Sequence, residues 1–251
     1  MIVESVCISN TGKLRGKNED NIYFNGRWLE QDNSGLKYSL LAKASTLDDP
    51  MFGVCDGMGG ENAGEIASYI AVSSIDYIRE SHKKKLLGAS EFLKRMISFV
   101  NDEVFNYSVE NGMGRMGSTL AAIMFRDNFA YVSNVGDSRI FRLRNNSFLQ
   151  MSVDDVEILP PNVKHKPRLT QHIGMDPTEI SIEPHISKCE LKKGDIFLIC
   201  SDGVTDMLTN IEIYNIIKTH ASIKSSIETL LKKSLENGGR DNISAIICRI
   251  R

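Results

Sequence analysis

The chain has 251 residues, of which 41% are hydrophobic, so it is long enough to bury one large core. Thirty lysine and arginine residues stand against 32 acidic residues, which gives a formal net charge of −2. This balance, without a basic stripe, argues against nucleic-acid binding and membrane binding. We therefore expect a single domain over residues 1–251.

The cysteines and the N-terminus indicate the compartment. The five cysteines are odd in number, show no C-x-x-C spacing and mostly lie in apolar runs, so free thiols in a reducing cytosol are expected. The first residues lack a basic stretch followed by a long apolar core, and no segment approaches the roughly 20 apolar residues that span a bilayer. These features predict a soluble, cytoplasmic protein, and we expect it to be a monomer.

The first fifth of the chain is predicted to consist of strands. Residues 2–9 alternate between apolar and polar side chains, and residues 21–25 form a second strand after a charged turn. Residues 26–50 are the least determined part, and we expect a hairpin there in which Trp28 packs against the core.

Two helices follow a buried strand at residues 51–55. Apolar residues recur at helical spacing from Glu61 to about His82, and the lysines at 83–85 suit the negative end of that helix. A second amphipathic helix is predicted from an N-cap at Ser90 to about Val109. The two helices are expected to form one layer.

The second half returns to strands. Four short strands, expected at residues 119–125, 129–135, 139–143 and 147–151, predict an antiparallel meander. A polar loop at residues 152–167 carries three prolines, and residues 169–174 are predicted to make one helical turn.

The last part of the chain repeats the order of strands and then helices. Further strands are predicted at residues 179–186 and 196–200, and Thr209 with Glu212 forms a capping box that opens a helix. Ser222 caps another helix, and the final strand covers residues 243–250. Strands, a helix pair, strands, a helix pair and a strand are the order expected for two packed sheets with a helical layer outside each, an α+β fold.

Several acidic residues stand where apolar runs end. Asp56 follows such a run and precedes three glycines, a pattern that on its own would more often mean an aspartate that closes a turn. The pattern recurs, because Asp202 ends the run IFLICSDG and Asp137 ends VSNVGD. If these strands finish together at one edge of the packed sheets, the acids gather in one place.

The acids at strand ends and adjoining turns form the candidate site. They are Glu19, Asp20, Asp56, Asp137, Asp202, Asp206 and Asp241. No histidine or cysteine pattern of zinc spacing accompanies them, and oxygen ligands alone select Mg²⁺ or Mn²⁺. Such a cluster is either a metal site or heavily protonated, because crowded carboxylates repel one another. Two metals sharing one aspartate would suit hydrolysis of a phosphate ester, with Arg15 donating two hydrogen bonds to the phosphate oxygens.

Five motifs in order across the chain resemble the metal-dependent protein phosphatase 2C family. They are R-x-x-N-E-D at 15–20, D-G-M-G-G at 56–60, G-D-S-R at 136–139, S-D-G-x-x-D at 201–206 and G-x-D-N at 239–242. DGMGG in place of DGHGG, together with the short length, is similar to the bacterial branch. The resemblance covers essentially the whole chain, and it implies a four-layer α-β-β-α sandwich of two antiparallel sheets flanked by helix pairs.

The resemblance also implies a role for each matched residue. Asp56 would bridge two Mn²⁺ or Mg²⁺ ions, Glu19 and the carbonyl of Gly57 would serve one of them, and Asp202 and Asp241 the other. Asp20 would hold a metal-bound water, and Arg15 would bind phosphate. Asp137, Asp202 and Asp206 match the positions of a weaker third metal, and residues 152–174 correspond to the flap that borders the cleft.

The implied function is hydrolysis of phosphoserine and phosphothreonine in proteins, opposing a bacterial serine/threonine kinase. The rival hypothesis is an inactive phosphoprotein-binding module of the same fold, but every matched acid is present. A metal nuclease is disfavoured by the lack of a basic groove. One departure concerns the proton donor, because Met58 stands where relatives with DGHGG have a histidine, and a thioether donates no proton.

Overall fold

The computed structural model describes residues 1–59, 63–82, 87–160 and 165–251. Two sheets lie face to face, and every pairing between their strands is antiparallel. The first sheet has the order β3 (Leu40–Ser45), β1 (Ile2–Asn10), β12 (Ile243–Ile250), β11 (Ile196–Cys200), β8 (Arg139–Arg144) and β9 (Ser147–Gln150). The second has the order β10 (His185–Glu190), β7 (Phe129–Val135), β6 (Leu120–Arg126), β4 (Met51–Gly59) and β2 (Asp20–Phe24), with β5 (Met116–Ser118) paired to β4.

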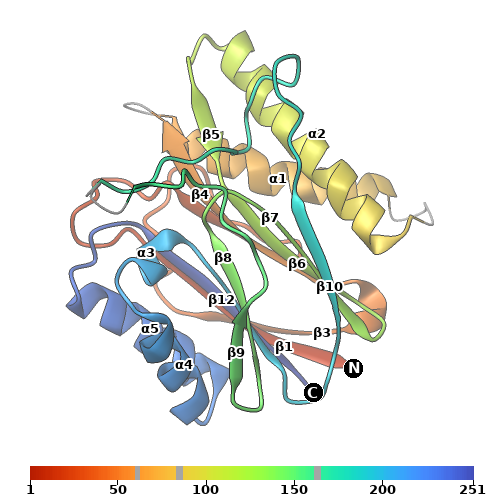
Figure 1. Ribbon diagram of the computed structural model, residues 1–251, viewed down its shortest axis with the longest axis vertical. Helices are drawn as coiled ribbons and strands as arrows, with labels where there is room; N and C mark the ends of the chain where they lie inside the picture. The colour runs from red at the N-terminus through yellow and green to blue at the C-terminus, as the bar shows by residue number, and fades with distance from the viewer. Residues whose placement is uncertain (60–62, 83–86, 161–164) are drawn as a thin grey trace.

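Helices cover both outer faces, which confirms the four-layer α-β-β-α sandwich (Figure 1). The helices α1 (Gly64–His82) and α2 (Ala89–Glu110) pack on the second sheet, and α4 (Asn210–Thr219) and α5 (Ile223–Glu236) on the first. Two shorter elements are η1 (Thr46–Asp48) and α3 (Asp202–Thr205). No helix in the described part of the chain combines the length and apolar character that a bilayer crossing requires.

The core between the sheets is held by a row of aromatic rings. Phe24 meets Phe52 edge to face at 5.4 Å, Phe52 meets Phe125 at 6.1 Å, and Phe125 reaches Phe197 of the opposite sheet at 5.4 Å. All four side chains are buried, and such pairs contribute about 0.5–1.5 kcal/mol each beyond their buried area. The row therefore packs one sheet against the other in the middle of the sandwich.

Many predicted elements are confirmed. The strands β7, β11 and β12 have the predicted bounds, and the Thr209 capping box opens α4. Trp28 packs on the core, stacked on Tyr23 at 6.4 Å. All five thiols are free, four of them buried, and burial raises the pKa of Cys7 to about 12.

The predicted meander is wrong, because its four strands belong to two sheets. β6 pairs with β7 in the second sheet, whereas β8 pairs with β9 in the first. The chain changes sheets after β7 at Gly136, which has φ +96 and lies so close to Thr119 that a Cβ would come within 2.7 Å of its Cγ2. This crossing carries Asp137 to the edge of the sandwich.

Other predictions fail at boundaries and pairings. Residues 40–45 pair with β1 instead of closing a hairpin, and the strand expected at 179–186 begins only at His185. Residues 169–174 make isolated bridges rather than a helical turn, since Leu169 pairs with Val156 and Ile173 with Ser118.

The predicted N-cap of α2 is wrong. The N-cap of α2 is Gly88, and Ser90 lies inside the helix. Gly60, Glu61 and the lysines at 83–85, on which further predictions fall, lie outside the described residues.

Candidate active site

The sandwich brings the predicted acids to one edge. Asp20 at the start of β2 lies directly opposite Asp56 near the end of β4. Asp202 opens α3 directly after β11, and Asp241 precedes β12. In Figure 1, α3 and the end of β4 lie on the same side of the sandwich. The expectation that these strands finish together is therefore confirmed.

Hydrogen bonds tie the acids of one sheet to the other. The Ser201 hydroxyl, beside β11, donates to Asp20 Oδ2 at 2.8 Å, and Ser244 N donates to the same hydroxyl at 3.1 Å. The backbone N–H of Glu19 donates to Asn242 Oδ1 at 2.8 Å. These contacts hold the β2 acids against the segment that carries Asp241.

Two glycines, Gly57 and Gly64, leave the space that Glu19 occupies. The backbone N–H of Gly57 donates to the carbonyl of Glu19 at 3.0 Å. A Cβ on Gly64 would lie 2.7 Å from the Glu19 carboxyl carbon and 3.0 Å from the carbonyl oxygen of Gly57. The carboxylate of Glu19 and the carbonyl of Gly57 thus converge at the start of α1, where a side chain would displace them.

Two cations lie among the acids. Arg15 Nη2 donates to Asp241 Oδ2 at 2.7 Å, and the Arg15 side chain is half exposed. On the other side of the cluster, Lys166 Nζ contacts Asp202 Oδ2, at 3.2 Å from Asp206 Oδ2 and 3.7 Å from Asp137 Oδ2. Arg15 was predicted to be part of the site, whereas Lys166 was not.

The donor set fits divalent ions that prefer oxygen. Asp20 Oδ1 and Asp202 Oδ1 are buried and have no hydrogen-bond partner among the described residues. A buried carboxylate oxygen without a donor is costly, and an ion would satisfy it. Within the described ranges no three acidic, histidine or cysteine side chains already converge on one point in coordinating geometry, and Arg15 and Lys166 are interleaved with the acids instead.

Comparison with known proteins identifies the family. The profile of protein phosphatase 2C matches residues 40–246. The chain belongs to the protein phosphatase 2C family. A serine/threonine phosphatase stp of Listeria welshimeri is 29% identical over 95% of this chain and 92% of the relative. PstP of Mycobacterium tuberculosis is 26% identical over 100% of this chain and 45% of that protein.

Solved structures share the fold of this phosphatase 2C family member. The crystal structure of Mycobacterium tuberculosis PstP superposes with a TM-score of 0.79 at 22% identity, covering both chains completely. PppA of Pseudomonas aeruginosa gives 0.73 at 26% identity, over 98% of this chain and 97% of that chain. A PstP catalytic domain in complex with two manganese ions gives 0.77 at 23% identity and full coverage of both chains. The predicted fold and family are confirmed.

Burial, together with repulsion between the carboxylates, raises pKa values at the site of this phosphatase 2C chain. Burial raises the pKa of Asp20 to about 7, against the hydrogen bonds from Ser201 and Ser244 and with further repulsion from Asp241. Burial, and then the charge of Asp20, raises the pKa of Asp56 well above its ordinary value. The pKa values of Glu19 and Asp137 are also raised, chiefly by burial. Without an ion, Asp20 and Asp56 therefore retain protons at pH values where free aspartates would lose them.

We expect the metal-free chain to lose stability as pH rises from 6 to 8. Because the pKa of Asp20 is higher in the folded chain, the folded state binds more protons than the unfolded state until the pH passes about 7. This contribution to stability is therefore largest at the low end of the window, falls as the pH approaches about 7 and levels off above that value. Melting temperatures in EDTA at pH 6, 7 and 8 measure the effect, and Asp20→Asn should flatten the dependence. An equal slope in both proteins would contradict this origin.

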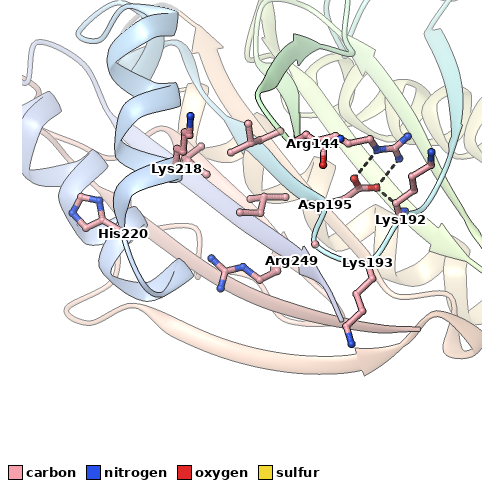
Figure 2. A pocket seen from close by; sticks show the side chains of 12 residues that line it. Arg144, Lys192, Lys193, Asp195, Lys218, His220 and Arg249 are labelled. Carbon is pink, nitrogen blue, oxygen red and sulfur yellow. Dashed lines mark hydrogen bonds and ion pairs between the residues drawn. The ribbon is translucent and has the colours of Figure 1, made fainter.

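A separate hollow lies where β8 ends, β11 begins and β12 ends, at the opposite ends of these three strands from the acids (Figure 2). It has a volume of about 380 Å³ and is lined by residues that include Arg144, Lys192, Asp195 and Arg249. Arg144 donates to both carboxylate oxygens of Asp195 at 2.7 Å, so the carboxylate there is already paired. The hollow is remote from the acidic edge, where the acids of the family motifs lie.

Sequence reasoning missed the residues that support the site. Ser201 and Asn242 lie inside recognised motifs, so their positions were available, but their contacts with Asp20 and Glu19 depend on how the sheets face each other. Lys166 lies in a polar segment with no motif, and nothing in its local sequence indicates three acids as partners.

Proposed function

We propose that this chain hydrolyses phosphoserine and phosphothreonine in phosphorylated proteins. The observation that carries the proposal is the gathering of the acids of all five family motifs at one edge of the sandwich, with Arg15 held beside them by Asp241. Sequence relatives across 95% of the chain are named serine/threonine phosphatases. The reaction transfers the phosphoryl group from a side-chain oxygen to water.

We assign the metal ligands as the family resemblance implies. The two principal ions would be held by Asp56 between them, by Glu19 and the carbonyl of Gly57, and by Asp202 and Asp241, with Asp137, Asp202 and Asp206 as a third, weaker site. Two such ions supply a water that is acidic enough to attack phosphorus near neutral pH. The buried, unpartnered oxygen of Asp202 supports this ligand assignment, and that of Asp20 supports its role in holding a metal-bound water.

The chain's own residues position the reactants. Asp20, fixed by the Ser201 hydroxyl, would accept a hydrogen bond from the attacking water. Arg15 is half exposed and held at Asp241, so its remaining N–H groups are available to the phosphate oxygens, and a guanidinium donates to two such oxygens at once. Arg15 therefore orients the ester, while the acids provide the chemistry.

The names of the relatives indicate the class of protein that this chain acts on. Relatives of this chain are named serine/threonine phosphatases, so we propose phosphorylated proteins, among them a bacterial serine/threonine kinase and its substrates, as partners. We also propose that residues 1–251 act as one monomeric catalytic domain. Every acid that matches the family motifs is present in the sequence, so no observation favours the inactive binding module.

Metal dependence tests the function directly. The purified chain should release phosphate from a phosphothreonine peptide with Mn²⁺ or Mg²⁺ and should lose this activity in EDTA, because the attacking water depends on the ions. Phosphate release measured in parallel with EDTA, Mg²⁺ and Mn²⁺ shows whether the activity depends on the ions. Activity that survives EDTA would overturn the metal mechanism, and no activity with either ion would favour the binding module.

A further inference from the structure

Lys166 is bound by three acids that the metal assignment gives to the third ion. Its Nζ contacts Asp202 Oδ2 and lies 3.2 Å from Asp206 Oδ2 and 3.7 Å from Asp137 Oδ2. The acids come from two separate segments, the crossing after β7 and the two ends of α3, so local sequence does not produce this convergence. One ammonium group thus occupies the centre of the predicted third site.

The three acids rely on this lysine. Among the described residues, Lys166 is the cation with which Asp137, Asp202 and Asp206 form ion pairs, whereas the nearby Arg139 pairs with Asp154 at 2.6 Å. The side chains of Asp137 and Asp202 are 13% and 12% exposed, so water screens their charges poorly. When no metal ion is present, a cation at this position offsets the repulsion between these carboxylates.

The lysine and an ion cannot both use these oxygens. An ammonium group needs acceptor oxygens for its three N–H groups, and a divalent ion needs the same lone pairs. Two cations a few ångströms apart also repel strongly in a partly buried site. Asp202 Oδ1, which is buried and unpartnered, remains open to an ion on its other side, so the two principal ions need not displace the lysine.

We propose that Lys166 is a tethered cation that occupies the third metal site and competes with the third ion for Asp137, Asp202 and Asp206. This inference rests on the metal assignment of the proposed function. The third site then binds its ion weakly because the ion has to displace a charge that the chain itself supplies. Segment 165–168 is thereby coupled to metal occupancy, since the lysine is released when the ion enters.

Metal titration of charge variants tests the competition. If the lysine occupies the acids nine-tenths of the time, removing it should tighten third-site binding about tenfold, because the apparent affinity scales with the open fraction. Calorimetric Mn²⁺ titrations should show this for Lys166→Met, with the two tighter ions unchanged. Lys166→Arg retains the charge and should resemble the wild type. Lys193→Met, a lysine at the remote hollow, is the control for loss of one positive charge.

A second readout follows the lysine itself. Acetylation of Lys166, measured by peptide mass spectrometry, should be slow in EDTA and at low Mn²⁺, and faster once the third site fills, whereas labelling of Lys193 should not change. Asp206→Asn should raise labelling of Lys166 without any metal. Comparable circular dichroism spectra of the variants ensure that folding is the same.

The outcomes separate this proposal from the function. Two tight ions in every variant, with a third-site affinity that is unchanged or weaker in Lys166→Met, would overturn the competition and leave the phosphatase assignment standing. Labelling of Lys166 that does not respond to Mn²⁺ would do the same. A wild-type chain that binds no ion would overturn the metal assignment and this proposal together.

Discussion

Asp56→Asn is expected to abolish nearly all phosphatase activity while the fold remains intact. Asp56 is the ligand assigned to both principal ions, so removal of its charge weakens both sites together. Even residues that only support metal ligands typically cost 10–100-fold when mutated, so we expect a loss of at least about 100-fold. Phosphate release from a phosphothreonine peptide at saturating Mn²⁺ measures it.

The structure explains why this substitution should spare the fold. The backbone of Asp56 is held by Thr119, whose hydroxyl accepts from Asp56 N at 3.0 Å and whose N–H donates to Asp56 O at 2.9 Å. These bonds do not involve the side chain. Burial raises the pKa of the Asp56 carboxyl, so a neutral amide should leave the metal-free chain as stable as the wild type or more so. The melting temperature in EDTA is the control, and retained turnover would remove Asp56 from the bridging role.

The local patterns of the chain were sufficient to predict most of the sandwich. β12 and β11 are continuous apolar runs bounded by turn residues, and the Thr209 capping box depends on contacts within one turn of helix. Each of these signals lies within a few residues of sequence. They are therefore visible without knowledge of the tertiary structure.

The wrong predictions concern segments whose secondary structure is determined by tertiary contacts. The segment at 40–45 has little periodicity of its own and becomes a strand because it pairs with β1. β10 begins at His185, the first residue that pairs with β7, and the pairing runs from Asn134 to Phe129 of β7. The change of sheet at Gly136 cannot be inferred from strand spacing, since a hairpin and a crossing both need a short turn. β-propensity reflects neighbours more than backbone preference, so these pairings had to be observed.

The residues of the site show the same contrast between local sequence signals and tertiary contacts. The acids were predictable because five motifs place them at the ends of apolar runs, and antiparallel strands return to the same edge. The roles of Ser201, Asn242 and Lys166 depend on contacts between segments that are distant in sequence. Sequence thus predicts which acids come together at this edge better than which residues hold them in place.

Asp137→Ala and Asp206→Ala are expected to impair hydrolysis of phosphothreonine peptides far more than hydrolysis of p-nitrophenyl phosphate. An alkoxide is a poor leaving group and needs a proton, but Met58 provides none. A third ion, which Asp137, Asp202 and Asp206 would hold, would acidify a nearby water and so supply the proton. General acid catalysis contributes about 10²–10⁴-fold, which is the selective loss expected on the peptide. The nitrophenolate departs without protonation and should be nearly unaffected.

Matched variants assign the loss to the third site. Asp206→Asn retains the shape of the side chain, and Asp127→Asn, on the turn between β6 and β7, removes an acid remote from the site. At saturating Mn²⁺, Lys166→Met should retain peptide activity, because the ion then holds the position that the lysine vacates. Loss of peptide activity in Lys166→Met alone would instead identify the ammonium group as the proton donor. Equal losses of the Asp137 and Asp206 variants on both substrates would mean that these acids assemble the metal centre and do not serve proton transfer.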